Sequence, residues 1–236
     1  ATGALTAQGL PPVPVPAENP ITPAKAVLGK ILFWDEQLSS DDTMACGTCH
    51  RPAAGGGDPR SGHHPGPDLV FHTIDDRFGS PGVIAQDAAG RFAPDANFPF
   101  ARQSTERASP SFFTSQWAAA QFWDGRALDT FLDPETDAVV IPTGGSLESQ
   151  PVGPILSSVE MSKTDRSWSE VIAKLSRVTP LALATDLPAD VSAALAGDPD
   201  YATLFQRAFT TPDITAARIG MALATYERTL IADQTP

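Results

Sequence analysis

Apolar residues recur along this chain mostly at the three- and four-residue spacing of amphipathic helices, which predicts a mainly helical fold. The first predicted helix begins after Thr22, the expected N-cap, with Pro23 in its first turn, and the last begins near Asp213. Each predicted helix offers one apolar face to a core. These faces are Val27, Leu28, Ile31 and Leu32; Trp168, Val171, Ile172 and Leu175; Tyr201, Leu204, Phe205 and Ala208; and the stretch from Asp213 through Tyr226 to about Leu230.

The rest of the chain shows weaker periodicity and is rich in Pro, Gly and Asp. Residues 1–21 fit an extended N-terminal arm, and residues 22–236 fit a single domain with long loops and very little β structure. Residues 111–127 predict a short apolar helix. The expected loops are 51–105 and 128–150, the second with a short strand at residues 139–141.

Composition narrows the classes of partner. The formal net charge of −12, from 28 acidic and 16 basic residues, argues against nucleic acid. An acidic surface could steer a basic redox protein, or it could serve solubility alone. No apolar run reaches the ~18 residues that a membrane span needs. The opening residues 1–4 fit a mature chain whose export signal has been removed, so we expect a periplasmic or otherwise exported protein.

The segment Cys46-Gly47-Thr48-Cys49-His50 carries the most specific chemistry. Two thiols one helical turn apart can each add to one vinyl group of a single porphyrin, and the next imidazole then meets the iron from below. A disulfide between Cys46 and Cys49, or a redox-active Cys-x-x-Cys pair, is the alternative, against which His50 argues. We therefore expect one covalently bound haem c, with His50 as the proximal iron ligand.

A sixth iron ligand would come from a methionine or another histidine. Met44 lies too close to the motif to reach the opposite face of a haem, and Met221 lies in an apolar helix and fits a core position better. Met161 directly follows Glu160. The loop 51–105 holds the remaining histidines, which are His63, His64 and His72.

Five ordered motifs resemble the N-terminal haem domain of the bacterial di-haem cytochrome c peroxidases, whose relatives include the methylamine dehydrogenase maturation enzyme. The resemblance runs from about residue 20 to the C-terminus and implies a class I cytochrome c-like fold. The motifs are Leu28-Gly29-Lys30-Ile31-Leu32-Phe33 with Asp35 and Leu38-Ser39 before the haem segment; Arg107 with Pro110-Ser111; Phe122-Trp123-Asp124-Gly125-Arg126-Ala127; Leu147-Glu148-x-Gln150 with Pro154 and Glu160-Met161; and Tyr226-Glu227-Arg228-Thr229-Leu230.

The resemblance implies a division of labour between two haems. The N-terminal haem binds hydrogen peroxide, and a second c-type haem collects electrons from a small cytochrome c or cupredoxin. The family's tryptophan between the haems matches Trp123, its active-site glutamate matches Glu160, and its neighbouring glutamine matches Gln150. Peroxide cleavage requires a proton to move from one oxygen to the other, which a carboxylate can achieve as base and then acid. Its pKa should rise in a partly dry pocket.

Each of these residues also has a purely structural interpretation. Glu160 could be a solvated loop carboxylate, and Trp123 could be a core aromatic residue. Gln150 could cap a loop instead of facing the haem. Arg126 could pair with a haem propionate or with Asp124.

The chain also departs from the family pattern. It has no second Cys-x-x-Cys-His segment, so we expect a truncated or processed product or one half of an assembly, with a true one-haem variant as the alternative. Residues 128–146 form an insertion. Many members have a loop histidine that ligates the resting iron, for which His64 and His72 are the candidates. Ala108 stands where some members place a calcium-binding Asn, which argues against a calcium site.

Three hypotheses follow for function. The first is a haem c peroxidase-type oxidoreductase that reduces hydrogen peroxide through a second haem. The second is a mono-haem electron-transfer subunit without catalysis, which requires a firmly bound sixth ligand. The third is an enzyme that oxidises a protein or organic substrate, as the maturation enzyme does.

Overall fold

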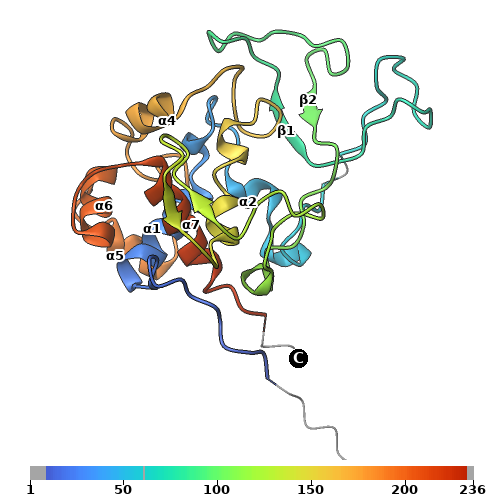
Figure 1. Ribbon diagram of the computed structural model, residues 1–236. Helices are drawn as coiled ribbons and strands as arrows, with labels where there is room; N and C mark the ends of the chain where they lie inside the picture. Colours follow the sequence, from blue (N-terminus) through green and yellow to red (C-terminus); the bar gives the residue numbers. More distant parts are fainter. Residues whose placement is uncertain (1–8, 61, 233–236) are drawn as a thin grey trace, which may run out of the picture.

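A computed structural model describes residues 9–60 and 62–232, and its helices gather on one side while long loops extend on the other (Figure 1). The expected opening of a mature chain at residues 1–4 lies outside the described residues. The α-helices are α1 (Pro23–Trp34), α2 (Cys46–Cys49), α3 (Ser146–Ser149), α4 (Trp168–Leu175), α5 (Ala189–Ala194), α6 (Tyr201–Phe209) and α7 (Ala216–Glu227). Short 3-10 helices are η1 (Glu36–Leu38), η2 (Pro52–Ala54), η3 (Ser115–Trp117) and η4 (Pro154–Leu156). The mainly helical prediction is confirmed.

The centre of the fold is the packing of α1 against α7. Thr22 caps α1 as predicted, because its Oγ1 accepts a hydrogen bond from the amide of Lys25 at 3.2 Å. Gly29 allows the two helices to approach closely, since a Cβ at this position would lie 1.9 Å from the carbonyl oxygen of Ala222. The predicted faces of α1, α4 and α6 lie in one hydrophobic core with α7.

The last helix begins two residues later than predicted. Thr215, not Asp213, is its N-cap, and the Thr215 Oγ1 accepts a hydrogen bond from the amide of Arg218 at 3.2 Å. The carbonyl of Asp213 instead accepts a hydrogen bond from the Arg218 guanidinium at 2.7 Å. A threonine is as good an N-cap residue as an aspartate, so the helix can start at either position, and it starts after Thr215.

The predicted apolar helix over residues 111–127 is wrong. Only η3 forms there, because Thr114, Phe122 and Gly125 adopt positive φ values of 69°, 65° and 69°, which interrupt a right-handed helix. A bridge between Gln121 and Ala127, with an N···O distance of 3.0 Å, closes the intervening residues into a tight turn. This turn presents residues 122–126 at the surface rather than in a core.

The little β structure consists of two antiparallel pairs. β1 (Pro81–Ile84) pairs with β2 (Arg102–Ser104) inside the expected loop 51–105, and runs this short carry no alternating pattern that would reveal them. β3 (Phe131–Leu132) pairs with β4 (Val139–Ile141), which confirms the predicted strand. The β3–β4 hairpin lies in the insertion and buries Phe131 and Ile141 against α7.

A buried ion pair holds α3 to α7. The carboxylate of Glu148 accepts hydrogen bonds from both Nη atoms of Arg228 at 2.5 and 2.8 Å, and Asn19 Nδ2 donates to it at 2.7 Å. Arg228 Nε also donates to the carbonyl of Pro14 at 3.1 Å, which ties the described part of the arm, residues 9–21, to the domain. Glu148 and Arg228 of the recognised motifs are therefore structural residues. Among the described residues, no helix has both the length and the apolar character that a membrane crossing requires.

Candidate active site

A cavity of about 690 Å³ lies where α2, β1, α7 and the loops around residues 107, 123 and 160 meet. This volume is in the range of cofactor pockets. Its border includes all the expected cofactor and catalytic residues: Cys46, Cys49, His50, Trp123, Arg126, Gln150 and Glu160. The candidate distal ligands His64 and His72 are not among the described residues that border it.

Helix α2 presents the haem-attachment residues to this cavity. It is one turn long, and the His50 amide closes that turn on the carbonyl of Cys46 at 2.9 Å. The His50 Nδ1 lies 3.2 Å from the carbonyl oxygen of Gly56, which leaves Nε2 available to a metal. Burial lowers the pKa of His50, so the imidazole is held neutral, as an iron ligand must be.

The loop that follows His50 is held by the Arg-x-x-Pro-Ser segment. Ser109 Oγ donates to the carbonyl of Cys49 at 2.7 Å, and Ser111 Oγ donates to the carbonyl of Gly55 at 2.6 Å. Gly56 has a φ of +84°, and a Cβ there would lie 2.9 Å from Ser111 Oγ. This segment therefore fixes the carbonyl that orients His50.

The two cysteines are free thiols in buried surroundings that favour a neutral sulfur. Burial raises the pKa of Cys46 above its ordinary value and that of Cys49 to about 11. A neutral thioether fits such positions, whereas a thiolate does not. Gly47 packs closely against Trp34 at the end of α1, because a Cβ built at Gly47 would lie only 2.4 Å from the Trp34 ring. With α2 held in this position, both cysteines border the cavity. The residues present therefore fit a porphyrin attached through both sulfurs.

Glu160 borders the cavity from the segment that follows η4. Its amide donates to Ser157 Oγ at 3.3 Å, which fixes the backbone at this point. Burial raises the pKa of the Glu160 carboxyl, although Ser157 and Arg126 partly offset this effect. The side chain is only half-buried. It therefore lies in a partly dry environment, which favours the protonated carboxyl more than water does.

Gln150 and Arg126 both border the cavity, and each also has a local structural contact. Gln150 is the C-cap residue of α3 and also borders the cavity. Arg126 forms an ion pair with Asp124 at 3.0 Å, stacks 3.7 Å from the Phe122 ring and borders the same cavity. The ion pair with Asp124 is thus present, and Arg126 keeps a position on the cavity wall.

Trp123 is not a core residue, which corrects one of its two interpretations. Its side chain is 73% exposed on the rim of the cavity, and the Arg107 guanidinium lies 4.5 Å from its ring. The left-handed backbone at Phe122 and the turn at Gly125 turn it outward. An exposed aromatic at the mouth of a cofactor cavity is in a position to meet another protein or domain.

Sequence reasoning missed one cavity residue with unusual electrostatics. Glu227, the last residue of α7, is 6% exposed and borders the cavity. Burial, with the nearby charge of Glu148, raises the pKa of its carboxyl to about 8. Leu223 lies four residues earlier on the same buried face of α7. This helical spacing predicts that the side chain of Glu227 is buried as well, and a buried glutamate is the signal that could have identified it.

The histidines of the loop after α2 lie in separate surroundings. His64 packs edge-on against Phe98, with ring centroids 4.7 Å apart, and its Nδ1 accepts a hydrogen bond from the amide of Gly66. His72 lies instead beside His63, with ring centroids 5.5 Å apart.

Comparison with known proteins places residues 23–236 on the family model of the di-haem cytochrome c peroxidases. The methylamine utilization protein MauG of Methylophilus methylotrophus is 28% identical over 224 residues, which are 95% of this chain and 45% of that protein. The cytochrome c551 peroxidase of Pseudomonas aeruginosa is 28% identical over 220 residues, which are 92% of this chain and 42% of that protein. The chain thus spans about half the length of these relatives.

Among solved structures, a crystal structure of a MauG-like protein associated with microbial copper homeostasis has a similar fold. The TM-score is 0.54 at 21% sequence identity, over 98% of this chain and 47% of that one. This likeness concerns the fold.

Proposed function

Because the chain belongs to the di-haem cytochrome c peroxidase family, we propose that it is the peroxidatic haem domain of an oxidoreductase that reduces hydrogen peroxide to water. The observation that carries this proposal is that His50, both cysteines and the carboxyl of Glu160 border one cavity. The family is typically periplasmic, which agrees with a covalently attached haem and with export of this chain.

The role assigned to the chain's own side chains is the transfer of protons between the two oxygens of peroxide. Cys46, Cys49 and His50 would hold a haem c, and that group would supply the redox chemistry by which peroxide is reduced. A carboxylate oxygen of Glu160 takes the proton from one peroxide oxygen and returns it to the other, so that water leaves as the O–O bond breaks. Overall, one peroxide, two protons and two electrons give two water molecules.

The electrons must enter from outside this cavity. We assign their entry to the exposed face around Trp123, where a second haem domain or chain would dock and receive electrons from a small cytochrome c or cupredoxin. The exposure of Trp123 at the cavity rim supports this assignment. Arg126 is assigned to a haem propionate, for which it would exchange part of its contact with Asp124, and Gln150 to hydrogen bonding above the iron.

The test is the reaction of the ferric holoprotein with peroxide, followed by stopped-flow absorbance and EPR. We expect an open or displaceable sixth position and rapid spectral change. Glu160→Gln should slow peroxide cleavage by about 10²–10⁴-fold, because it removes the proton acceptor, while the haem stays attached. Intact mass measures that attachment.

Glu106→Gln is the matched control. Glu106 borders the same cavity, but its side chain is 88% exposed, so this variant should keep the wild-type rate. Unchanged kinetics in Glu160→Gln, or an equal loss in Glu106→Gln, would remove Glu160 from the mechanism.

One observation favours a second candidate, the mono-haem electron carrier. Met161 also borders the cavity, next to Glu160, so the wall that carries the proposed proton acceptor also carries a methionine. This candidate predicts a low-spin six-coordinate ferric spectrum and no reaction with peroxide. The same EPR measurement decides between the two.

A further inference from the structure

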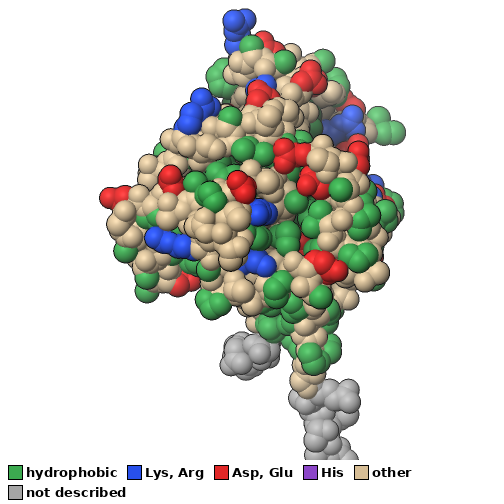
Figure 2. All heavy atoms as spheres, turned by 60° about the vertical axis from the view of Figure 1, so that its left-hand side comes forward, with side chains coloured by type: hydrophobic (Ala, Val, Ile, Leu, Met, Phe, Trp, Pro, Cys, Tyr) green, Lys and Arg blue, Asp and Glu red, His purple; other side chains and the backbone are tan. Residues whose placement is uncertain are grey.

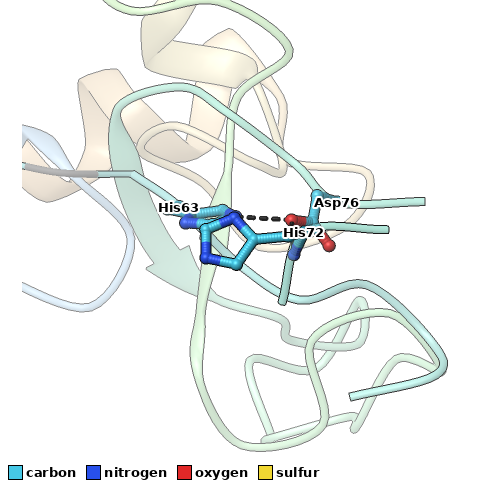
Figure 3. Close-up of side chains that lie close together, drawn as sticks. All are labelled: His63, His72 and Asp76. Atoms are coloured by element: carbon cyan, nitrogen blue, oxygen red, sulfur yellow. Dashed lines mark hydrogen bonds and ion pairs between the residues drawn. The ribbon is translucent and has the colours of Figure 1, made fainter. Parts of the chain in front are cut away.

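Away from the haem cavity, two histidines and one aspartate of the loop between η2 and β1 face one another (Figure 3). One ligand atom from each of His63, His72 and Asp76 lies within 4.8 Å of the other two. None of the three borders the described haem cavity, and the proposed function does not use them. We propose that they form a binding site for a divalent transition-metal ion, of which Zn²⁺ and Cu²⁺ match two imidazoles and one carboxylate.

Hydrogen bonds hold the Asp76 carboxylate in a fixed orientation. The Asp76 side chain is 1% exposed, and its Oδ2 accepts hydrogen bonds from His63 Nε2 at 2.5 Å and from the backbone amide of His72 at 2.7 Å. Thr73 Oγ1 lies 3.2 Å from Oδ1. The His72 amide and the Thr73 hydroxyl are outer partners of the kind that orients a metal-ligating carboxylate.

The imidazoles are fixed by different means. The His63 ring is stacked on Phe78, with centroids 4.3 Å apart, and meets Phe71 edge-on at 4.8 Å. His72 has a φ of 72°, a left-handed conformation that is costly for a residue with a β-carbon. This backbone brings the His72 ring beside His63 and leaves it exposed, so solvent can reach the site and occupy the remaining coordination positions.

Metal binding requires the exposed His72 ring to move inward by up to about 1.5 Å, because its ligand atom lies within 4.8 Å of the other two, and it requires His63 and Asp76 to separate. Two ligand atoms about 2.0–2.1 Å from a tetrahedral ion lie about 3.3 Å apart. The 2.5 Å contact between His63 Nε2 and Asp76 Oδ2 must therefore open by less than 1 Å, and the ion replaces the proton that the two atoms share. The simpler alternative is a hydrogen bond that only pins the loop, and it predicts no metal uptake.

The test uses tag-free holoprotein, in which the attached haem occupies Cys46, Cys49 and His50. The protein is stripped of loosely bound metal with EDTA and then titrated with Zn²⁺. The pH is about 7.5, where imidazole is ordinarily neutral. We expect one bound Zn²⁺ per chain by calorimetry and elemental analysis, beyond the haem iron. Ca²⁺ should not bind, because imidazole nitrogen is a poor ligand for it.

His72→Asn removes one ligand while preserving the fold, since Asn tolerates the left-handed backbone and keeps the amide that bonds Asp76. It should weaken Zn²⁺ binding by more than the 10–100-fold that loss of an outer partner costs. His64→Asn, in the same loop but outside the cluster, should bind like the wild type. Absence of uptake, or equal binding in wild type and His72→Asn, would overturn the proposal.

Discussion

At the scale of single residues, the orientation of His50 depends on one backbone carbonyl. Gly56 provides it at φ +84°, and the same carbonyl also accepts a hydrogen bond from the amide of Phe112. A methyl group at Gly56 would lie 2.9 Å from Ser111 Oγ and 3.0 Å from the Phe112 amide nitrogen. The peptide must therefore shift if a side chain is added.

Gly56→Ala should raise the reduction potential of the attached haem. The shifted carbonyl weakens the His50 hydrogen bond, which makes the imidazole a weaker electron donor to the iron. Gly55→Ala is the matched control, because Gly55 has a φ of +67° but nothing within 4 Å of a built Cβ. Both variants should lose about 1–2 kcal/mol of stability from left-handed strain. Potentiometric titration separates them, and equal potentials would contradict this role for Gly56.

Glu227 makes the stability of the domain depend on pH. Its folded-state pKa is about 8, well above that of an exposed glutamate, so the folded chain keeps a proton that the unfolded chain releases. This contribution is fully present below the unfolded pKa and is lost as pH rises toward 8. The wild type should therefore lose on the order of 1.4 kcal/mol of unfolding free energy per pH unit between about pH 5 and pH 8 from this group.

Glu227→Gln removes that dependence. The variant should be more stable than the wild type at pH 7–8 and similar to it near pH 4, where both side chains are neutral. Urea unfolding of the holoprotein, followed by circular dichroism across this range, measures the difference. A stability gap that does not change with pH would show that Glu227 stays ionised in the folded chain.

At the scale of elements, the contact of α1 with α7 organises the core. A Cβ at Gly29 would meet the Ala222 carbonyl oxygen at 1.9 Å and the Tyr226 Cβ at 2.9 Å, and neither group can rotate away. Gly29→Ala should therefore separate the helices and cost about 3 kcal/mol or more. Gly9→Ala, where a built Cβ meets nothing within 4 Å, should unfold like the wild type. Thermal unfolding of the three proteins tests this.

Local patterns predicted those elements that depend on local interactions. The sequence predicts the apolar stripe of α1, its Thr22 cap and the Cys46–His50 segment, because the residues of each are close together in the chain. Residues 111–127 were predicted as a helix because their apolar content is helix-like, but Phe122 and Gly125 adopt left-handed conformations that belong to the turn around Trp123. No periodicity shows which loop residues meet across a cavity.

The residues of the candidate site also differ in whether local sequence patterns predict them. Cys46, Cys49 and His50 follow from their spacing alone, whereas Glu160 and Gln150 could be named only through the family resemblance. Glu227 was missed because its side chain reaches the cavity from the far end of the chain, a contact that depends on α7 packing beside α1. The His63 and Asp76 pair likewise depends on how a loop folds back on itself.

At the scale of the whole molecule, the chain carries one haem motif and spans about half the length of its relatives. If residues 1–236 are prepared as a holoprotein by themselves, we expect one reaction with peroxide followed by slow turnover with reduced small cytochrome c, because these residues supply one haem motif only. Stopped-flow and steady-state rates on one preparation measure this. Steady turnover as fast as the single reaction would show that this chain needs no second haem.

The charges visible on one side of the molecule form no patch of a single sign. Acidic and basic side chains are interspersed over the side shown in Figure 2. The proposed docking site for a second domain is the Trp123 rim, where Arg107 and Arg126 lie beside exposed aromatic surface. Trp123→Ala should therefore leave the single reaction with peroxide unchanged and slow only electron delivery from a partner.

The cavity beside α2 affects how much of the protein can accumulate in the cell. Its walls come from segments that are distant in the sequence, and most of them are loops that a porphyrin would hold together from within. A chain released without its cofactor would have a hollow centre in place of its largest apolar component, and cellular proteases remove such loosely folded chains. The amount of this protein that accumulates should accordingly follow the supply of haem to the machinery that attaches it.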